Sequence, residues 1–189
     1  MSEDLVDLIW RLGARHPGHD YRIFTTHFVD AENPRTGETK RFSLIEAVDW
    51  VNVIALTPDD QVVLIKQYRP GRDQVCLEIP GGMVDAGESP ETAAQRELLE
   101  ETGYTAQTWE VLGATAPNPA IQNNRLWSYV ALDATPTHAP TPEGNEVITL
   151  ETRSLPDVRK ALLDGRIDHA LVVAAFGLLS LRLGELRRP

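Results

Sequence analysis

Residues 82–104 carry the stretch that decides the fold, GMVDAGESPETAAQRELLEETGY. Within it, Glu97, Glu100 and Glu101 are spaced i, i+3 and i+4, which places three carboxylates on one face of a helix. Like charges at this spacing destabilise a helix slightly. The acidic stripe therefore indicates a bound cation, and its hard oxygen ligands favour Mg²⁺ or Mn²⁺. The alternative is an ordinary solvated acidic helix.

The ends of this helix are also marked in the sequence. Ser89 is a favourable N-cap, and Pro90 suits the first helical position because an N–H is not needed there. Gly103 predicts the end, since glycine readily adopts the left-handed conformation that terminates a helix. Ala94 and Leu98 lie four residues apart on a different side from the glutamates, and we expect them to face the core.

The stretch resembles the Nudix box, written G-x5-E-x7-R-E-U-x-E-E-x-G-U with U a bulky apolar residue. The fixed positions that match are Gly82, Glu88, Arg96, Glu97, Leu98, Glu100, Glu101 and Gly103. Tyr104 occupies the last position, where an aliphatic residue is more usual, and this departure concerns packing only. The resemblance implies an α+β chain with the Nudix fold, an α/β/α sandwich with a mixed β-sheet and an N-terminal antiparallel extension.

The same resemblance implies roles for the acidic residues. Glu97 and Glu101 correspond to the principal ligands of Mg²⁺, with Mn²⁺ as the alternative ion, and the backbone carbonyl of Gly81 belongs to the ligand set. Glu100 is implied to belong both to this metal cluster and to the catalytic residues. Arg96 is implied to orient the glutamates through charge-assisted hydrogen bonds and is counted with the catalytic residues.

The composition of the 189 residues is that of an ordinary globular chain, with 42% hydrophobic and 24% charged residues. The net charge of −10 argues against a nucleic-acid partner, because binding a phosphate backbone needs a basic surface. Cys76, the single cysteine, lies in an apolar run, so we expect a buried small hydrophobe and a reducing cytoplasm. The N-terminus lacks the basic region of a signal peptide, and the apolar run 170–179 is too short to span a bilayer, so no membrane association is expected.

Apolar alternation and turn residues predict strands at 21–29, 39–47, 51–56, 62–68, 77–79, 108–114, 125–132 and 146–151. Further helices are expected at 4–13, 155–164 and 168–183, and a loop at 136–144. Residues 48–189 are expected to form the Nudix hydrolase domain. By the family resemblance, the helix and strands of residues 1–47 are expected to mediate formation of a homodimer.

Two segments narrow the resemblance to one branch of the family. Gln67-Tyr68-Arg69 and Leu77-Glu78-Ile79-Pro80-Gly81-Gly82 are similar to the Q-Y-R and L-E-x-P-[AG]-G elements of ADP-ribose pyrophosphatases and nucleoside-diphosphate-sugar hydrolases. Arg69 is thereby implied to bind the substrate phosphates, as a guanidinium does through paired hydrogen bonds. Glu78 is implied to order the substrate or the loop. The alternatives are a surface salt bridge for Arg69 and an exposed position on an edge strand for Glu78.

Further candidates for substrate binding lie at loop and strand ends. Asn124 and Arg125 follow a turn-rich segment and carry groups that can hydrogen-bond a sugar or a pyrophosphate, although turn formation explains them equally well. Trp50 and Phe28 are candidates for stacking on the nucleobase, against a packing role for either ring. Trp127 is expected to pack in a sheet.

In the enzymes that this chain resembles, the general base often lies on a mobile loop after the last sheet strands, and the resemblance therefore implies Glu143 and Glu146 as the two candidates. Both have the alternative of being solvated loop acids. The expected function is Mg²⁺-dependent hydrolysis of a nucleoside diphosphate sugar, such as ADP-ribose or GDP-mannose, to a nucleoside monophosphate and a sugar phosphate. The rival interpretations are a Nudix hydrolase of nucleoside triphosphates and a non-catalytic sensor of ADP-ribose.

Overall fold

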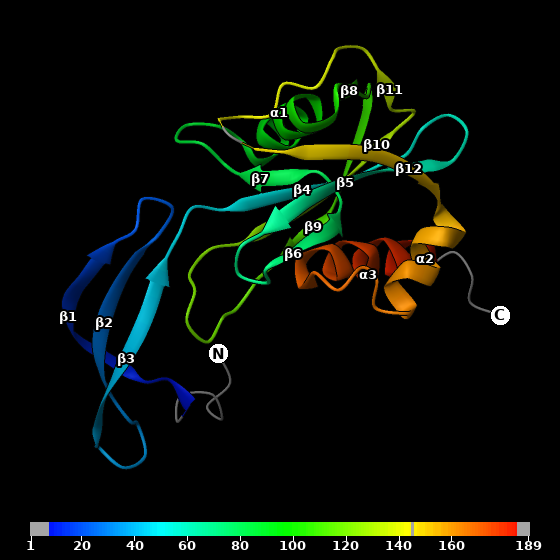
Figure 1. Cartoon of the computed structure of the whole chain (residues 1–189). Coiled ribbons are helices and arrows are strands. Elements are labelled where there is room, and N and C mark those ends of the chain that lie inside the picture. The colour runs from blue at the N-terminus through cyan, green and yellow to red at the C-terminus, as the bar shows by residue number, and fades with distance from the viewer. Residues whose placement is uncertain (1–7, 145, 185–189) are drawn as a thin grey trace. The chain divides into compact units, whose positions relative to one another are not determined.

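The computed structural model describes residues 8–144 and 146–184. The chain divides into two units. The first unit spans Met1–Val48 and Ala116–Asn124, and the second spans Asp49–Thr115 and Arg125–Pro189. In Figure 1 the strands of the first unit are blue to cyan, and the second unit runs from cyan through green and yellow to red.

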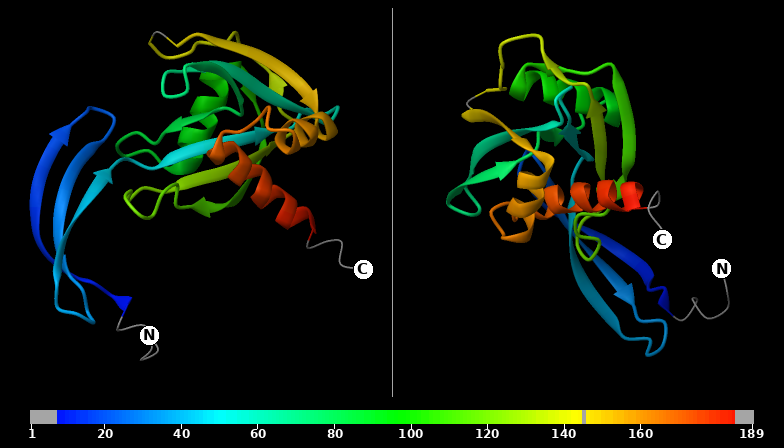
Figure 2. Two further views of the ribbon diagram at one scale, coloured as in Figure 1. Left: turned by 60° about the horizontal axis from the view of Figure 1, so that its bottom comes forward. Right: turned by 90° about the vertical axis from the view of Figure 1, so that its right-hand side faces the viewer.

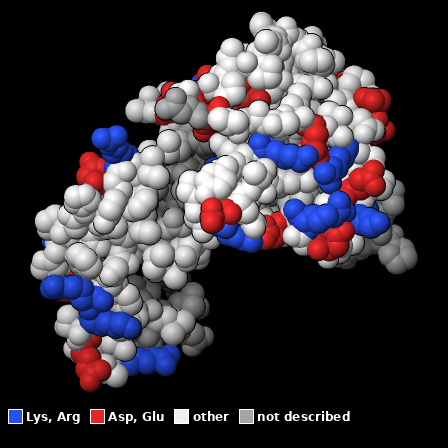
Figure 3. Space-filling view, in the orientation of Figure 1, with Lys and Arg blue, Asp and Glu red and all other residues white. Residues whose placement is uncertain are grey.

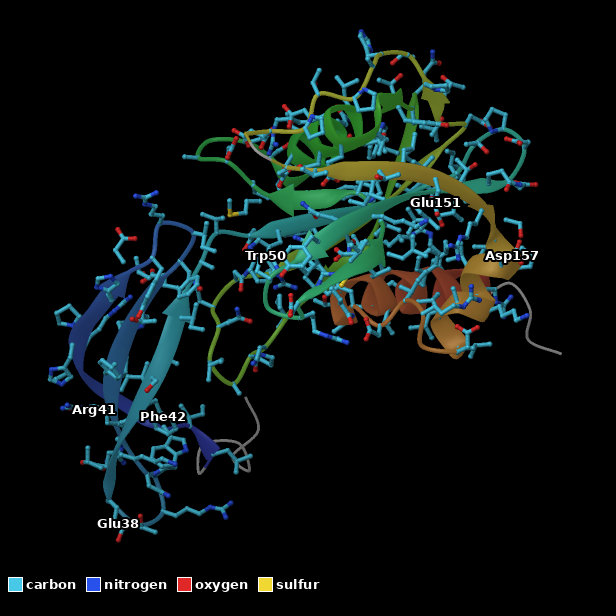
Figure 4. All side chains as sticks on the ribbon, in the orientation of Figure 1. Glu38, Arg41, Phe42, Trp50, Glu151 and Asp157 are labelled. Atoms are coloured by element: carbon cyan, nitrogen blue, oxygen red, sulfur yellow. The ribbon has the colours of Figure 1, made fainter. Side chains whose placement is uncertain are left out.

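The first unit is a three-stranded antiparallel sheet. Its strands are β1 (Arg11–Asp20), β2 (Thr25–Glu32) and β3 (Thr39–Glu46), in the spatial order β1-β2-β3. Phe42 on β3 packs edge to face against Trp10, with ring centroids 5.1 Å apart, and is labelled in Figure 4. The loop 116–124 joins this unit through the backbone N–H of Ile45, which donates to the carbonyl of Ile121 at 2.7 Å. The expected N-terminal antiparallel extension is confirmed.

The helix expected at 4–13 is wrong where the structure describes it, because residues 11–13 belong to strand β1. Residues 4–7 lie outside the described part of the chain. Gly13 disfavours a helix at this point. Pro17 further along β1 is tolerated because β1 is an edge strand, where a missing backbone donor costs little.

The second unit contains a mixed set of strands. They are β4 (Trp50–Ala55), β5 (Gln61–Arg69), β6 (Gln74–Glu78), β7 (Gly81–Met83), β8 (Tyr104–Thr105), β9 (Thr108–Thr115), β10 (Leu126–Leu132), β11 (Thr135–Pro136) and β12 (Ile148–Ser154). The sheets have the orders β7-β4-β10-β9, β12-β5-β6 and β11-β8. Strands β4 and β10 run parallel and the other neighbours antiparallel, so the predicted mixed sheet is confirmed.

Three helices cover the strands of the second unit: α1 (Pro90–Thr102), α2 (Leu155–Leu163) and α3 (Ala170–Gly184). Figures 1 and 2 show α1 on one side of the strands, with α2 and α3 on the other. The alternation along β4 explains this layering. Val51 and Val53 pack in a core with Leu98 of α1, whereas Ile54 packs in a second core with Phe176 of α3. The expected α/β/α sandwich is thereby confirmed.

The structure also confirms the expected helices at 155–164 and 168–183 to within two residues at each end, and the burial of Cys76. Strands β7, β8 and β11 have two or three residues each, too few to produce a periodic pattern in the sequence. None of the helices in the described ranges is long and apolar enough to cross a membrane. Figure 3 shows basic and acidic side chains interspersed over β12 and α2, where Lys66 and Arg153 pair with Glu151.

Candidate active site

Helix α1 is held by caps at both ends and by its apolar side. The hydroxyl of Ser89 accepts the N–H of Thr92 at 3.1 Å, and Gly103 adopts a φ of 74° and donates its N–H to the carbonyl of Leu99 at 2.7 Å. Leu98 is fully buried in the core beneath the helix. The predicted ends and core face of the helix are therefore confirmed.

Arg96 connects the acidic side chains of α1 to the loop before it. Its Nε and Nη2 donate to the two carboxylate oxygens of Glu88 at 3.1 and 3.0 Å, and Nη2 also donates to the carbonyl of Met83 at 2.9 Å. Its Nη1 donates to Glu97 at 2.9 Å and to Glu100 at 3.2 Å. The bonds to Glu88 contribute most to raising the pKa of Arg96 above its usual value. One permanent cation therefore orients three carboxylates.

Glu101 is the most deeply buried of the three predicted glutamates, with 4% of its surface exposed. Its Oε2 accepts the backbone N–H of Gly81 at 2.9 Å. Burial raises the pKa of Glu101 to about 8; the bond from Gly81 opposes this rise, and the charges of Glu97 and Glu146 add to it. Burial also raises the pKa of Glu97, against the hydrogen bond from Arg96. This pocket thus disfavours the anionic carboxylates unless a cation joins them.

Two glycines of strand β7 allow close approach of its neighbours, helix α1 at Gly82 and strand β4 at Gly81. A Cβ atom at Gly82 would collide with the carboxylate of Glu97, and one at Gly81 would collide with the backbone carbonyl of Val51 on β4. Both glycines are needed for the absence of a side chain rather than for a left-handed conformation. The backbone of the loop therefore forms one wall of the acidic site.

The donor set of this site suits a hard divalent cation. In the ranges that the structure describes, no three His, Cys, Asp or Glu side chains converge to enclose an ion. Glu97 and Glu100 are drawn to Arg96, and Glu101 is bound to Gly81. Burial and repulsion between carboxylates raise the pKa of Glu97 and of Glu101, so both gain from a divalent charge, and the oxygen ligands of this site fit Mg²⁺ or Mn²⁺.

Arg69, the last residue of β5, and Glu78, the last residue of β6, form a bidentate salt bridge. Nε of Arg69 donates to Oε1 of Glu78 at 2.8 Å, and Nη2 donates to Oε2 at 2.7 Å. Oε2 also contacts Nδ1 of His169 at 2.9 Å. Burial alone would raise the pKa of Glu78, but the hydrogen bonds from Arg69 and His169 outweigh it and lower the pKa to about 2.

The structure rejects the alternative considered for Glu78 and contains the salt bridge considered for Arg69. Glu78 lies on the edge strand β6 but is 2% exposed, so the exposed position considered for it is wrong. The salt bridge considered for Arg69 is present. It leaves 40% of the arginine side chain exposed.

A cavity of about 320 Å³ brings several predicted residues together. Its walls include Trp50, Arg69, Glu78 and Gly81 from the predicted set, and Figure 4 shows Trp50 at the start of β4. His169, which precedes α3, lines the same cavity but was not predicted. A single histidine before an apolar helix has no spacing pattern that relates it to Glu78, 91 positions earlier in the chain.

The two candidate bases have different surroundings. Oε1 of Glu146 accepts a hydrogen bond from Nε2 of Gln67 at 3.4 Å, and the negative charge of Glu146 acts on both Glu97 and Glu101. Glu143 and Glu146 are both exposed, so the contact with Gln67 and the charge effect on the glutamates of α1 distinguish Glu146. Gln67, part of the Q-Y-R segment, was not predicted as a site residue, and its contact with a residue 79 positions away has no signature in the sequence.

The remaining predicted substrate residues lie elsewhere in the two units. Phe28 is 36% exposed on β2 of the first unit, and Asn124, also in the first unit, is buried and donates through Nδ2 to the carbonyl of Val48 at 3.1 Å. This bond joins residues 76 positions apart, so it is not the local turn hydrogen bond considered as the alternative for Asn124. In the second unit, the guanidinium of Arg125 lies over the ring of Trp127, 5.7 Å from its centroid. Trp127 packs against the core beneath α1, as expected.

Comparisons with known proteins agree with this geometry. The chain is 30% identical over 162 residues to the methanol dehydrogenase activator of Bacillus methanolicus, covering 85% of this chain and 87% of that protein. It is 31% identical over 110 residues to the ADP-ribose pyrophosphatase of Bacillus subtilis (strain 168), covering 58% of this chain and 59% of that protein. A crystal structure of an ADP compounds hydrolase superimposes with a TM-score of 0.82 at 25% identity, covering 95% of this chain and 97% of the other.

The NUDIX domain model matches residues 46–176, which include the glycine loop, the acidic helix α1 and the cavity beside them. The match therefore covers more than half of the chain and the whole candidate site. On this evidence, the chain belongs to the Nudix domain family.

Proposed function

We propose that this Nudix diphosphatase hydrolyses the pyrophosphate bond of a nucleoside diphosphate sugar. ADP-ribose is the first substrate to test and would yield AMP and ribose 5-phosphate; GDP-mannose is the second. The relatives named ADP-ribose pyrophosphatase and ADP compounds hydrolase support this substrate class. One observation carries the proposal: the cavity that Arg69 lines is also lined by Gly81 and Gly82, and these two glycines adjoin Glu101 and Glu97 of α1 respectively.

Glu97, Glu100, Glu101 and the backbone carbonyl of Gly81 are the residues that would hold Mg²⁺, with Mn²⁺ as the alternative. When bound, the ion supplies charge neutralisation and activation of water. Arg96 would keep Glu97 and Glu100 in fixed conformations through its Nη1 group, which lowers the cost of bringing them to one ion. The raised pKa values of Glu97 and Glu101 support this assignment, since a divalent cation offsets the free-energy cost of burying these charges.

Arg69 is proposed to bind the substrate phosphates with the end of its guanidinium that faces the cavity. Glu78 takes up Nε and one N–H of Nη2, so three of the five N–H groups stay available to phosphate oxygens. Trp50 lines the same cavity and offers an aromatic face for the nucleobase. Phe28, Asn124 and Arg125 stay predictions as substrate contacts.

Glu146 is proposed as the general base, in preference to Glu143. Its carboxylate is held by Gln67 and acts electrostatically on two of the proposed ligands, Glu97 and Glu101. A base must lie within reach of the attacking water beside the reacting phosphorus, and this placement supports Glu146 for taking up the proton of that water. Glu143 lies on the same loop and is assigned no proton transfer.

A homodimer and a cytoplasmic location complete the proposal. The family resemblance supports the dimer, and the single cysteine supports a reducing compartment. The net charge of −10 favours a small-molecule substrate over a nucleic acid.

The test is a panel of substrates incubated with Mg²⁺, with products separated by ion-exchange chromatography. ADP-ribose, ADP-glucose, GDP-mannose and UDP-glucose represent the proposed class, and ATP and dGTP represent the triphosphate alternative. We expect the substrate with the highest kcat/KM of the panel to be a sugar nucleotide. Its cleavage should stop when EDTA is added. Preference for a triphosphate would replace the proposed substrate class. Tight ADP-ribose binding without turnover would instead identify a sensor.

A further inference from the structure

The start of helix α3 is attached to the rest of the second unit at three points. Nδ1 of His169, immediately before the helix, contacts Oε2 of Glu78 at 2.9 Å. The neighbouring Asp168 pairs with Arg72 at 2.8 Å, and Nδ2 of Asn52 on β4 donates to the carbonyl of Leu171 at 2.9 Å. Because the last two contacts are independent of Glu78, the helix remains anchored when the contact of His169 is removed.

The contact of His169 has a defined donor. Glu78 is ionised, with its pKa lowered to about 2, so its carboxylate only accepts hydrogen bonds. Nδ1 of His169 therefore carries the proton in this bond. Oε2 of Glu78 receives both this bond and the 2.7 Å bond from Nη2 of Arg69, while Oε1 receives Nε of Arg69 at 2.8 Å.

A buried carboxylate that accepts from two sides cannot rotate about its terminal bond without losing a charge-assisted hydrogen bond. Glu78 is 2% exposed, so water does not replace a lost donor readily. The plane of its carboxylate in turn sets the plane of the Arg69 guanidinium, because the two meet through paired, nearly parallel bonds. His169 and Arg69 are thus connected through the carboxylate of Glu78.

We infer that His169 is a positioning residue for phosphate recognition: through Glu78 it holds Arg69 with its free N–H groups facing the cavity. The inference rests on the proposed function, in which Arg69 binds the pyrophosphate of the substrate. Since Arg69 binds phosphate oxygens in the bound substrate and in the transition state alike, a misoriented Arg69 weakens binding more than the chemical step. His169 therefore affects KM more than kcat.

The chain offers matched variants for this test. His169→Ala removes the donor, and His169→Asn restores an N–H close to the position of Nδ1. Asp168→Asn breaks the adjacent ion pair with Arg72, which is an exposed contact outside the cavity lining. We expect KM for ADP-ribose to rise roughly tenfold in His169→Ala, with kcat changed by less than about threefold. KM should return to within about twofold of the wild type in His169→Asn and stay unchanged in Asp168→Asn.

A double-mutant cycle with Arg69→Ala shows whether His169 acts through the arginine. In the Arg69→Ala background, adding His169→Ala should change KM by less than about twofold, because the arginine that it positions is absent. The inference would be overturned if His169→Ala raised KM by the same factor with and without Arg69. It would also be overturned if Asp168→Asn raised KM as much as His169→Ala.

A binding measurement separates this inference from the proposed activity. The Kd of the non-hydrolysable α,β-methylene analogue of ADP-ribose, measured by calorimetry with Mg²⁺, should rise in His169→Ala in the same proportion as KM. If the wild type binds the analogue but cleaves no sugar nucleotide, the proposed function fails while the role of His169 in phosphate binding is still measured. If the wild type cleaves ADP-ribose and His169→Ala binds the analogue as well as the wild type, only the inference fails.

Discussion

The backbone N–H of Gly81 donates a hydrogen bond of 2.9 Å to Oε2 of Glu101, and so ties the most buried glutamate of helix α1 to the glycine loop. The bond lowers the pKa of Glu101, but burial outweighs it and raises the pKa to about 8. Protonation of this one carboxylate therefore affects both the stability of the fold and the affinity of the site for a cation.

The metal-free protein is expected to lose stability as the pH rises through this range. In the unfolded chain Glu101 releases its proton near the ordinary value of 4.5, whereas in the folded chain it keeps the proton up to about pH 8. The folded state therefore binds more protons between these values, and the free energy of unfolding falls with rising pH. Urea unfolding in EDTA, at about pH 5 and about pH 8, measures the change.

Glu101→Gln is the control for this pH dependence, because glutamine keeps an acceptor for Gly81 and does not titrate. The free energy of unfolding of the variant should vary less between the two pH values, and turnover should fall more than about 100-fold if Glu101 holds the metal. Mg²⁺ should raise the Tm of the wild type more at about pH 8 than at about pH 5, since protons compete for the ligand. Equal pH slopes in wild type and variant would contradict the raised pKa.

Replacing Arg96 by lysine keeps the positive charge but removes the planar guanidinium, so the variant tests whether the hydrogen-bond geometry of Arg96 matters for activity. The guanidinium makes five hydrogen bonds, to Glu88, Met83, Glu97 and Glu100, and an ammonium cannot reproduce this planar arrangement. We expect kcat/KM to fall roughly 10- to 100-fold and the Mg²⁺ concentration for half-maximal activity to rise. Arg182→Lys, in an exposed pair with Glu110, is the matched control and should keep wild-type activity. Equal activity of both variants would show that only the charge of Arg96 matters.

The acidic helix and its caps could be predicted from sequence because the information is local. Ser89, Glu97 and Gly103 act over spacings set by helical geometry. The contact of Glu78 with His169 joins residues 91 positions apart, and no periodicity relates them. The same holds for segment 116–124, which joins the first unit although its neighbours in the chain belong to the second. Such contacts depend on how the strands, helices and loops pack against one another. No local pattern in a single sequence predicts this packing.

Gly82→Ala should impair activity more than stability. The new Cβ would meet the carboxylate of Glu97, the far end of a flexible side chain that can move away at little cost to folding. The moved carboxylate would no longer be placed as a ligand, so we expect kcat/KM to fall at least roughly tenfold with a change in Tm of only a few degrees. Gly71→Ala, at a position with open space, should be neutral in both measurements. A fully active Gly82→Ala enzyme would argue against Glu97 as a ligand.

Glu146 and Glu143 lie on one loop, so exchanging each for glutamine tests the base at constant loop length. Both residues are exposed, but Glu146 accepts a hydrogen bond from Gln67 and its negative charge acts on Glu97 and Glu101. We expect Glu146→Gln to lower kcat by roughly 10² to 10⁴ with little change in KM, and Glu143→Gln to lower it less than about threefold. Because glutamine cannot take up a proton, raising the pH should not restore Glu146→Gln, whereas an exogenous base small enough to enter the site should restore part of the rate. Equal, small losses in both variants would place the base outside this loop.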